Sequence, residues 1–153
     1  MLHAKRTKKL SRKYELTEDG SVVTTFSLRG GGTGAQFTLR GIDYRVRIHR
    51  FSGVYELLDG AGSTVASTDR VGRDWNLTCS GRVVAFHQAA MMGRKYTMID
   101  DNGAPAGAIR RITRSETTAD LPGLDLLVQV FALVVVVLRR RRKQAAALRS
   151  VAT

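Results

Sequence analysis

Residues 126–138, LLVQVFALVVVVL, are the most informative about the fold of this chain, and the basic sequence RRRRK at 139–143 follows them immediately. Val130 to Leu138 is apolar without a break, and a helix that is apolar on every side must be enclosed on every side. Asp120 suits a helix cap and Pro122 suits a first turn, so we expect a helix over about 121–143. The β-branched run from Val134 to Val137 disfavours a helix, but an uninterrupted strand of this length would be unusual.

The alternative to enclosure by the protein is that this segment spans a lipid bilayer. The stretch 126–138 rises roughly 20 Å at ~1.5 Å per residue, against a hydrocarbon core of ~30 Å. Extension back to Leu121 brings in Asp125, and an Asp costs roughly 2.5–3.5 kcal/mol near the centre of a span. Either orientation would also be awkward, because it places the arginines outside or moves the whole preceding chain across without a signal peptide. We therefore favour a helix enclosed by the protein, and a single span anchored by residues 121–138 is the alternative.

The chain before this segment reads as short β-strands. Along residues 44–49, apolar side chains alternate with Arg45, Arg47 and His49, which is the period of a half-buried strand. Turn sequences such as Asp-Gly at 59–60 and Asn-Gly at 102–103 separate the candidates. The candidates are 12–16, 21–28, 35–40, 43–50, 54–58, 63–67, 74–79, 82–88, 94–99 and 106–112. Their spacing is typical of one antiparallel sandwich or barrel.

The positive charge lies at the two ends of the chain. The formal net charge is +12, from 25 Lys and Arg against 13 Asp and Glu, and neither end holds an acid. We expect residues 1–13 to form a flexible basic arm and residues 144–153 to form a tail. Basic ends on a neutral body favour attraction to an anionic surface. The candidate contacts are Lys5, Arg6, Lys8, Lys9, Arg12, Lys13, Arg45, Arg47, Arg139, Arg140, Arg141, Arg142 and Lys143.

Other motifs give little support to catalysis or cofactor binding. The string GGGTGA at 30–35 has the spacing of a dinucleotide loop, but a strand follows it, so a hairpin is the better interpretation. The three histidines lie far apart and Cys79 is alone, so we expect no metal site. Asp100 and Asp101 precede Asn-Gly and are interpreted as turn residues. We therefore expect neither a catalytic site nor a cofactor, and no small-molecule substrate is indicated.

The order of these segments resembles the tubby C-terminal-like superfamily, which includes LURP-one-related proteins and phospholipid scramblases. The likeness covers roughly residues 14–143. It is carried by VYELLD at 54–59, Gly62, Val65-Ala66, Trp75-Asn76-Leu77, Gly81-Arg82-Val83, Phe86, RKYTMID at 94–100, Gly103, Gly107-Ala108-Ile109 and Asp120-Leu121-Pro122. The last of these resembles small actinobacterial members in which DLP precedes an apolar helix. The resemblance implies a mainly β protein: a closed antiparallel barrel of roughly 10–12 short strands that wraps one buried hydrophobic C-terminal helix.

The function expected from this resemblance and from the charge is a non-enzymatic module that binds anionic phospholipid or a membrane-associated partner through its basic ends. Non-specific nucleic-acid binding is the alternative, since the pI is near 10.8. Few aromatic residues are free to stack on bases, so nucleic-acid binding is the weaker of the two hypotheses. The lone cysteine and the lack of a signal-peptide core favour a cytoplasmic protein, free or peripheral to a membrane.

Overall fold

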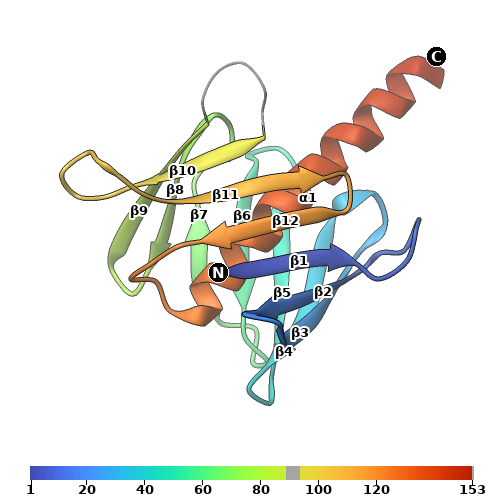
Figure 1. Ribbon diagram of the computed structural model, residues 1–153. Helices are drawn as coiled ribbons and strands as arrows, with labels where there is room; N and C mark the ends of the chain where they lie inside the picture. Colours follow the sequence, from blue (N-terminus) through green and yellow to red (C-terminus); the bar gives the residue numbers. More distant parts are fainter. Residues whose placement is uncertain (89–93, 153) are drawn as a thin grey trace.

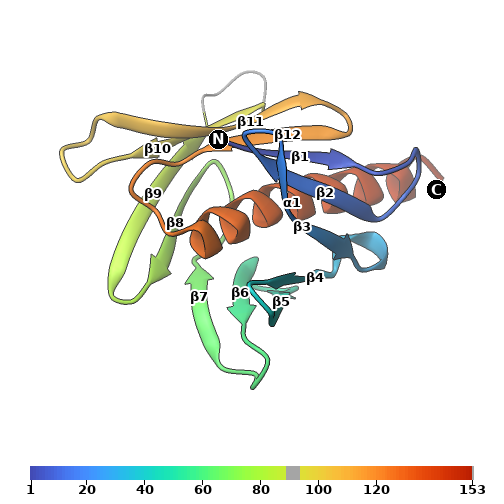
Figure 2. The same cartoon turned by 60° about the horizontal axis from the view of Figure 1, so that its bottom comes forward.

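The protein is a closed barrel of antiparallel strands with one long helix running through it (Figures 1 and 2). The computed structural model describes residues 1–88 and 94–152. Each strand pairs with its neighbours in the chain, and β1 closes the ring by pairing with β12. The strands are β1 (Leu2–Arg6), β2 (Lys13–Glu18), β3 (Ser21–Leu28), β4 (Gly34–Leu39), β5 (Ile42–His49), β6 (Val54–Leu58), β7 (Thr64–Thr68), β8 (Asp74–Cys79), β9 (Arg82–Gln88), β10 (Lys95–Ile99), β11 (Pro105–Thr113) and β12 (Glu116–Asp120). This confirms the expected fold class.

All ten strand candidates from the sequence are strands, with ends displaced by a residue or two. Their alternation sets which side chains face inward: Tyr44, Val46 and Ile48 of β5 are buried, while Arg45 and Arg47 are exposed. The glycine-rich string forms a short 3-10 turn, η1 (Gly30–Gly32), between β3 and β4. No helix follows it, so the hairpin interpretation is confirmed and the dinucleotide loop is excluded.

The N-terminal stretch corrects the sequence-based expectation. Leu2–Arg6 is a strand of the barrel wall, paired with β2 on one side and β12 on the other. Leu2 and Ala4 are completely buried in the core. The prediction of a flexible arm over residues 1–13 is therefore wrong for this segment. His3 and Lys5 occupy the outward positions of the alternation. Arg6 falls on the same side as Leu2 and Ala4, and its guanidinium group packs over the ring of Tyr14.

The helix α1 (Leu126–Ala152) passes through the barrel as expected for Val130 to Leu138. Every residue of that stretch is completely buried except Val136, which is 8% exposed. Burial of an all-round apolar surface by the strands outweighs the modest cost of β-branched residues in a helix. Among the described residues, no helix has the length and apolar character needed to cross a membrane.

Both ends of α1 differ from the expected bounds of 121–143. The helix begins at Leu126, because Leu121 precedes a proline and Gly123 adopts a positive φ of 82° in the connecting turn. The side chain of Gln129 donates to the carbonyl of Leu124 at 2.7 Å and closes the helix entrance. At the other end, the alanine-rich sequence favours helix and extends α1 to Ala152, beyond the barrel wall (Figure 1).

Candidate anion-binding site

The up-and-down order of the strands sends alternate loops to opposite ends of the barrel. The loops 7–12, 29–33, 50–53, 69–73 and 114–115, together with Arg94, lie at the end where α1 leaves; we call this the exit end. The loops 19–20, 40–41, 59–63, 80–81, 100–104 and 121–125 lie at the entrance end. Backbone bonds join the exit-end loops, as from Val71 N to the Gly53 carbonyl at 3.1 Å. The helix is anchored there by Arg139, whose Nε donates to the Val71 carbonyl at 3.0 Å.

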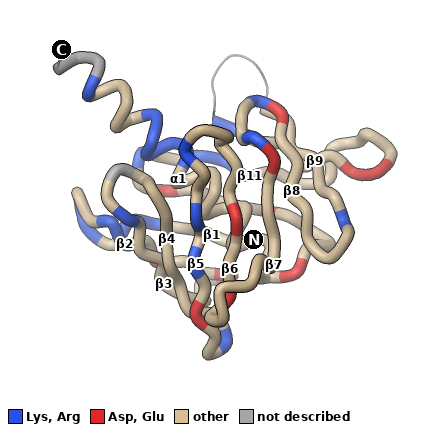
Figure 3. The backbone as a smooth tube through the Cα atoms, turned by 180° about the vertical axis from the view of Figure 1, so that it is seen from behind, with Lys and Arg blue, Asp and Glu red and all other residues tan. Residues whose placement is uncertain are grey.

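The two ends carry opposite charge. The exit-end cations are Lys8, Lys9, Arg12, Arg29, Arg50, Arg70, Arg73, Arg94 and Arg114, and the only acid of these described loop residues is Asp69. The entrance-end loops hold Asp19, Asp59, Asp100, Asp101 and Asp125, with Arg40 as the single cation among them. Asp69 is engaged locally, because it accepts hydrogen bonds from the backbone and side chain of Asn76. Figure 3 shows Lys and Arg along the emerging helix and the loops near it.

Two large apolar side chains project from exit-end loops. Leu10 in loop 7–12 is 83% exposed, and Phe51 in loop 50–53 is completely exposed. Each has cations beside it in the chain: Lys8 and Lys9 precede Leu10, and Arg50 precedes Phe51. Exposed apolar side chains among cations have the character of a surface that meets an anionic lipid interface.

A cavity of about 350 Å³ opens beside α1 at this end. Five cations from three elements line it: Arg94 before β10, Arg111 of β11, and three helix residues one turn apart or less, Arg139, Arg140 and Lys143. Gln88, Tyr96 and Gln144 add uncharged polar groups, and Val136 and Ala147 give it an apolar side. None of the described residues that line it is acidic.

The barrel holds the helix arginines in fixed positions around the cavity. Arg139 Nη1 donates to the Tyr96 hydroxyl at 3.2 Å, and burial raises the pKa of that tyrosine although Arg139 opposes the rise. Arg140 Nη1 donates to Thr117 Oγ1 at 3.2 Å, but its Nε and Nη2 are buried without a hydrogen-bond partner among the described residues. Arg140 remains a cation at neutral pH.

The ion pairs among the described residues include none of these cations. Desolvation, together with Arg111 and Arg6, lowers the pKa of Arg140, although Tyr14 partly opposes this. Partial desolvation and the charges of Arg139 and Arg73 likewise lower the pKa of Lys143. Part of this lowering of the pKa comes from repulsion among these side chains as cations. A bound anion would reduce that repulsion.

The structure separates the residues expected from the sequence to contact anions. Lys8, Lys9 and Arg12 lie at the exit end, as do Arg139 to Lys143 at the point where α1 emerges. Lys5 instead lies on the outer barrel wall, where its Nζ is 4.0 Å from Glu116 Oε1. The Cζ atom of Arg6 lies 5.8 Å from the centre of the Tyr14 ring. Lys13 begins β2.

Arg45 and Arg47 lie on the outer wall, in β5. Arg47 and His49 both contact Glu56 of β6. The hydrogen bond from His49 is the main cause that lowers the pKa of Glu56, with Thr64 and Arg47 assisting and desolvation opposing. Arg47 is therefore partly neutralised within the wall, which makes it a weaker contact for an anion than the loop cations.

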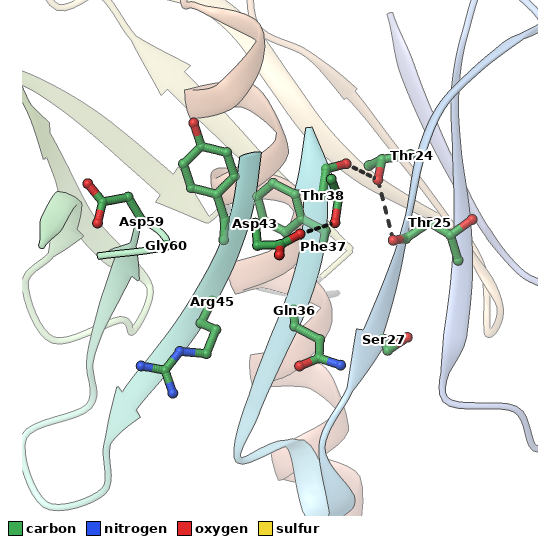
Figure 4. Close-up of a pocket in the computed structure, with 11 residues that line it drawn as sticks. Thr24, Thr25, Ser27, Gln36, Phe37, Thr38, Asp43, Arg45, Asp59 and Gly60 are labelled. Atoms are coloured by element: carbon green, nitrogen blue, oxygen red, sulfur yellow. Dashed lines mark hydrogen bonds between the residues drawn. The ribbon is translucent and has the colours of Figure 1, made fainter. Parts of the chain in front are cut away.

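Arg45 borders a hollow of about 600 Å³ on the outer face of β3 to β5 (Figure 4). Its polar groups already bond to one another. Thr24 donates to the Thr38 carbonyl at 2.6 Å, and Thr38 donates to Asp43 at 2.5 Å. Asp59 is likewise occupied, because it accepts from backbone N–H groups of its own turn. This shallow face has one cation against two acids and shows no converging set of free groups.

Sequence reasoning missed Arg94 and Arg111 as site residues, because they lie in the electrically neutral middle of the chain. The available signal for Arg94 was the alternation of turns: once an up-and-down barrel is assumed, every second turn carries a cation, whereas four of the six intervening turns carry an acid. Arg111 lies within β11, so the turns gave no signal for it. The described residues contain no group of three or more His, Cys, Asp or Glu side chains that could hold a metal ion. Comparison with protein families, curated proteins and solved structures finds no match to the chain.

Proposed function

We propose that this protein is a non-enzymatic module that binds the surface of an anionic phospholipid membrane with the exit end of its barrel. The observation that carries the proposal is the segregation of charge between the two ends, nine loop cations with one engaged acid against five loop acids with one cation. Each Lys or Arg near an anionic bilayer contributes roughly 1 kcal/mol of attraction. The acidic entrance end would turn away from such a surface, so the charge distribution selects one orientation.

Exposed apolar residues strengthen the fit to a bilayer over a purely polar polyanion. Leu10 and Phe51 stand at loop tips on the exit end, where they could enter the boundary between head groups and acyl chains. Duplex DNA would attract the same cations but offers no apolar layer to those two side chains. Membership of the tubby-like superfamily is part of this proposal and is supported by the closed barrel around a central helix.

The charge segregation is tested by cosedimentation with vesicles of phosphatidylcholine containing phosphatidylglycerol. The variant K8Q/K9Q/R50Q removes three exposed exit-end cations, and R40Q/R45Q/R110Q removes three exposed cations from elsewhere. The net charge of the two variants is equal. At roughly 1 kcal/mol per cation, we expect the first variant to lose about a hundredfold or more in partitioning, and the control to lose much less.

Equal losses in the two variants would mean that net charge alone causes binding, and failure of the unaltered protein to sediment at low salt would overturn the proposal. Binding should also weaken as salt shortens the Debye length from ~10 Å at 0.1 M to ~3 Å at 1 M. Because DNA binding has the same salt trend, excess duplex DNA is added as a competitor. Displacement from vesicles by DNA at low molar excess would favour nucleic acid as the partner.

The apolar contribution is tested separately with L10S/F51S. Full transfer of such side chains from water gives about 1.5–3 kcal/mol each, so we expect partitioning to fall at least about tenfold. V83S is the control, because Val83 is also largely exposed but lies near the start of β9, by the entrance end. Binding of L10S/F51S equal to that of V83S would show that the loops contact the surface without entering it.

A further inference from the structure

The cavity beside α1 has features that a general attraction to anionic surfaces does not require. Diffuse attraction needs exposed cations on loops, and the loops 7–12 and 50–53 supply these. The cavity instead brings cations from the helix, β11 and the residue before β10 around one open concave volume of about 350 Å³. Such convergence in a concave, partly apolar space is the usual character of a site for a defined chemical group.

The cost of building this arrangement points to an anionic occupant. Arg140 lies partly inside the barrel, where its Nε and Nη2 are buried without partners among the described residues. A buried donor without a partner costs about 1–3 kcal/mol, and more when it is charged. Arg111 and Arg6 add like charge nearby, and no described lining residue is acidic. An anion in the cavity would act on this cluster by offsetting the repulsion among its cations.

The number of donors indicates what kind of anion. Arg94 and Arg111 lie side by side, because the Arg111 N–H donates to the Arg94 carbonyl at 2.8 Å, and both line the cavity together with Arg140 and Lys143 of α1. A phosphate monoester carries close to two negative charges at neutral pH and three terminal oxygens. A phosphodiester carries one charge and two such oxygens, so it leaves more of these donors unpaired. Planar guanidinium forks match the geometry of phosphate oxygens.

The tyrosine and the apolar side of the cavity define how the rest of the ligand would lie. Tyr96 holds Arg139 in place through its hydroxyl, and the Tyr96 ring packs edge-on against Trp75, with centroids 6.0 Å apart. Val136 and Ala147 of α1 line the remainder. These two residues are roughly 16 Å apart along the helix at ~1.5 Å per residue, so an ester with a short carbon skeleton beside its phosphate would contact one of them, whereas bare phosphate would not.

We propose that this cavity binds a phosphate monoester, as presented by a phosphorylated lipid head group or by a soluble phosphate ester. The lipid form rests on the proposed function and deepens it, because the loops would then supply general attraction to the bilayer while the cavity selects the head group. The soluble form does not depend on membrane binding.

The lipid form is tested with two vesicle preparations of equal surface potential, one with phosphatidic acid, a monoester, and one with phosphatidylglycerol, a diester. Charge-assisted hydrogen bonds contribute about 1.5–3 kcal/mol each, so we expect at least about tenfold stronger partitioning to phosphatidic acid. The variant R94Q/R111Q should bring this ratio close to one. R40Q/R110Q is the matched control, because it also removes two cations, both exposed, and Arg110 precedes Arg111 in β11 but lies on the outer wall; it should keep the ratio.

The soluble form is tested by calorimetric titration of the whole protein with glycerol 3-phosphate and with inorganic phosphate. Thermal unfolding shows whether R94Q/R111Q is folded, and R94K/R111K, which keeps the charge, should restore part of the binding. Binding of glycerol 3-phosphate that R94Q/R111Q abolishes supports the cavity even if no vesicle binds, in which case the proposed function alone fails. Equal partitioning to the two vesicles together with no heat from either soluble phosphate would overturn the cavity proposal and leave the proposed function standing.

Discussion

Replacement of Val135 by Asp should unfold this protein. Val135 is completely buried in the middle of the enclosed part of α1, with strands on all sides. An unpaired carboxylate in such a core costs several kcal/mol whether it stays charged or takes up a proton. Domains of this size are stable by roughly 5–15 kcal/mol, so much of the free energy of unfolding would be lost. Circular dichroism during thermal unfolding measures the change.

The control for this substitution is Val22→Asp, in β3, where the side chain is 62% exposed. It introduces the same chemical group into the same protein and should shift the melting temperature by only a few degrees. A Val135→Asp protein that melts cooperatively near the unaltered temperature would show that α1 is not enclosed by the strands.

Removal of residues 1–6 should be nearly as damaging. A chain beginning at Thr7 lacks β1, so β2 and β12 lose the strand that joins them and become open edges. It also loses the buried side chains of Leu2 and Ala4. Burial of the leucine alone accounts for about 1.5–3 kcal/mol, and the unpaired edges would promote aggregation. We expect a melting temperature lower by at least about 10 °C, or insoluble protein.

Truncation at the other end provides the comparison. A chain that stops at Gln144 loses the part of α1 that extends beyond the barrel, where Ala146 to Arg149 are exposed. It should melt within a few degrees of the intact protein. If both truncations were equally mild, residues 1–6 would be an accessory segment and the barrel would not depend on β1 for closure.

The core of the fold was predictable because the pattern of apolar residues indicates which side chains are buried. Val130 to Leu138 is apolar on every side, and alternation along segments such as β5 marks which side chains face inward. The strands β1 and β12 were missed because their inward residues are few, small or polar. Ala4 and Thr117, both almost completely buried, do not stand out from a background of charged and hydroxyl side chains. Their pairing is a property of the closed ring rather than of either segment.

The candidate site was predictable in part. The helix cations from Arg139 to Lys143 follow the apolar segment directly, so their position at one mouth of a barrel follows from enclosure of that segment. Arg94 and Arg111 lie some 30 to 45 residues earlier and reach the same cavity only through the strand order. A count of charge along the chain hides the difference in charge between the two ends of the barrel, because the basic exit-end turns are interspersed with mostly acidic entrance-end turns and the charges cancel.

The measurement that tests the central claim most directly is which end of the barrel meets the bilayer. In a C79S background, a single environment-sensitive fluorophore is attached to S52C beside Phe51 at the exit end, or to N102C in the acidic entrance-end loop 100–104. On addition of anionic vesicles, the label at residue 52 should shift to the blue and brighten, while the label at residue 102 should stay unchanged. A response at residue 102, or no response at residue 52 although the protein sediments with the vesicles, would contradict docking by the exit end.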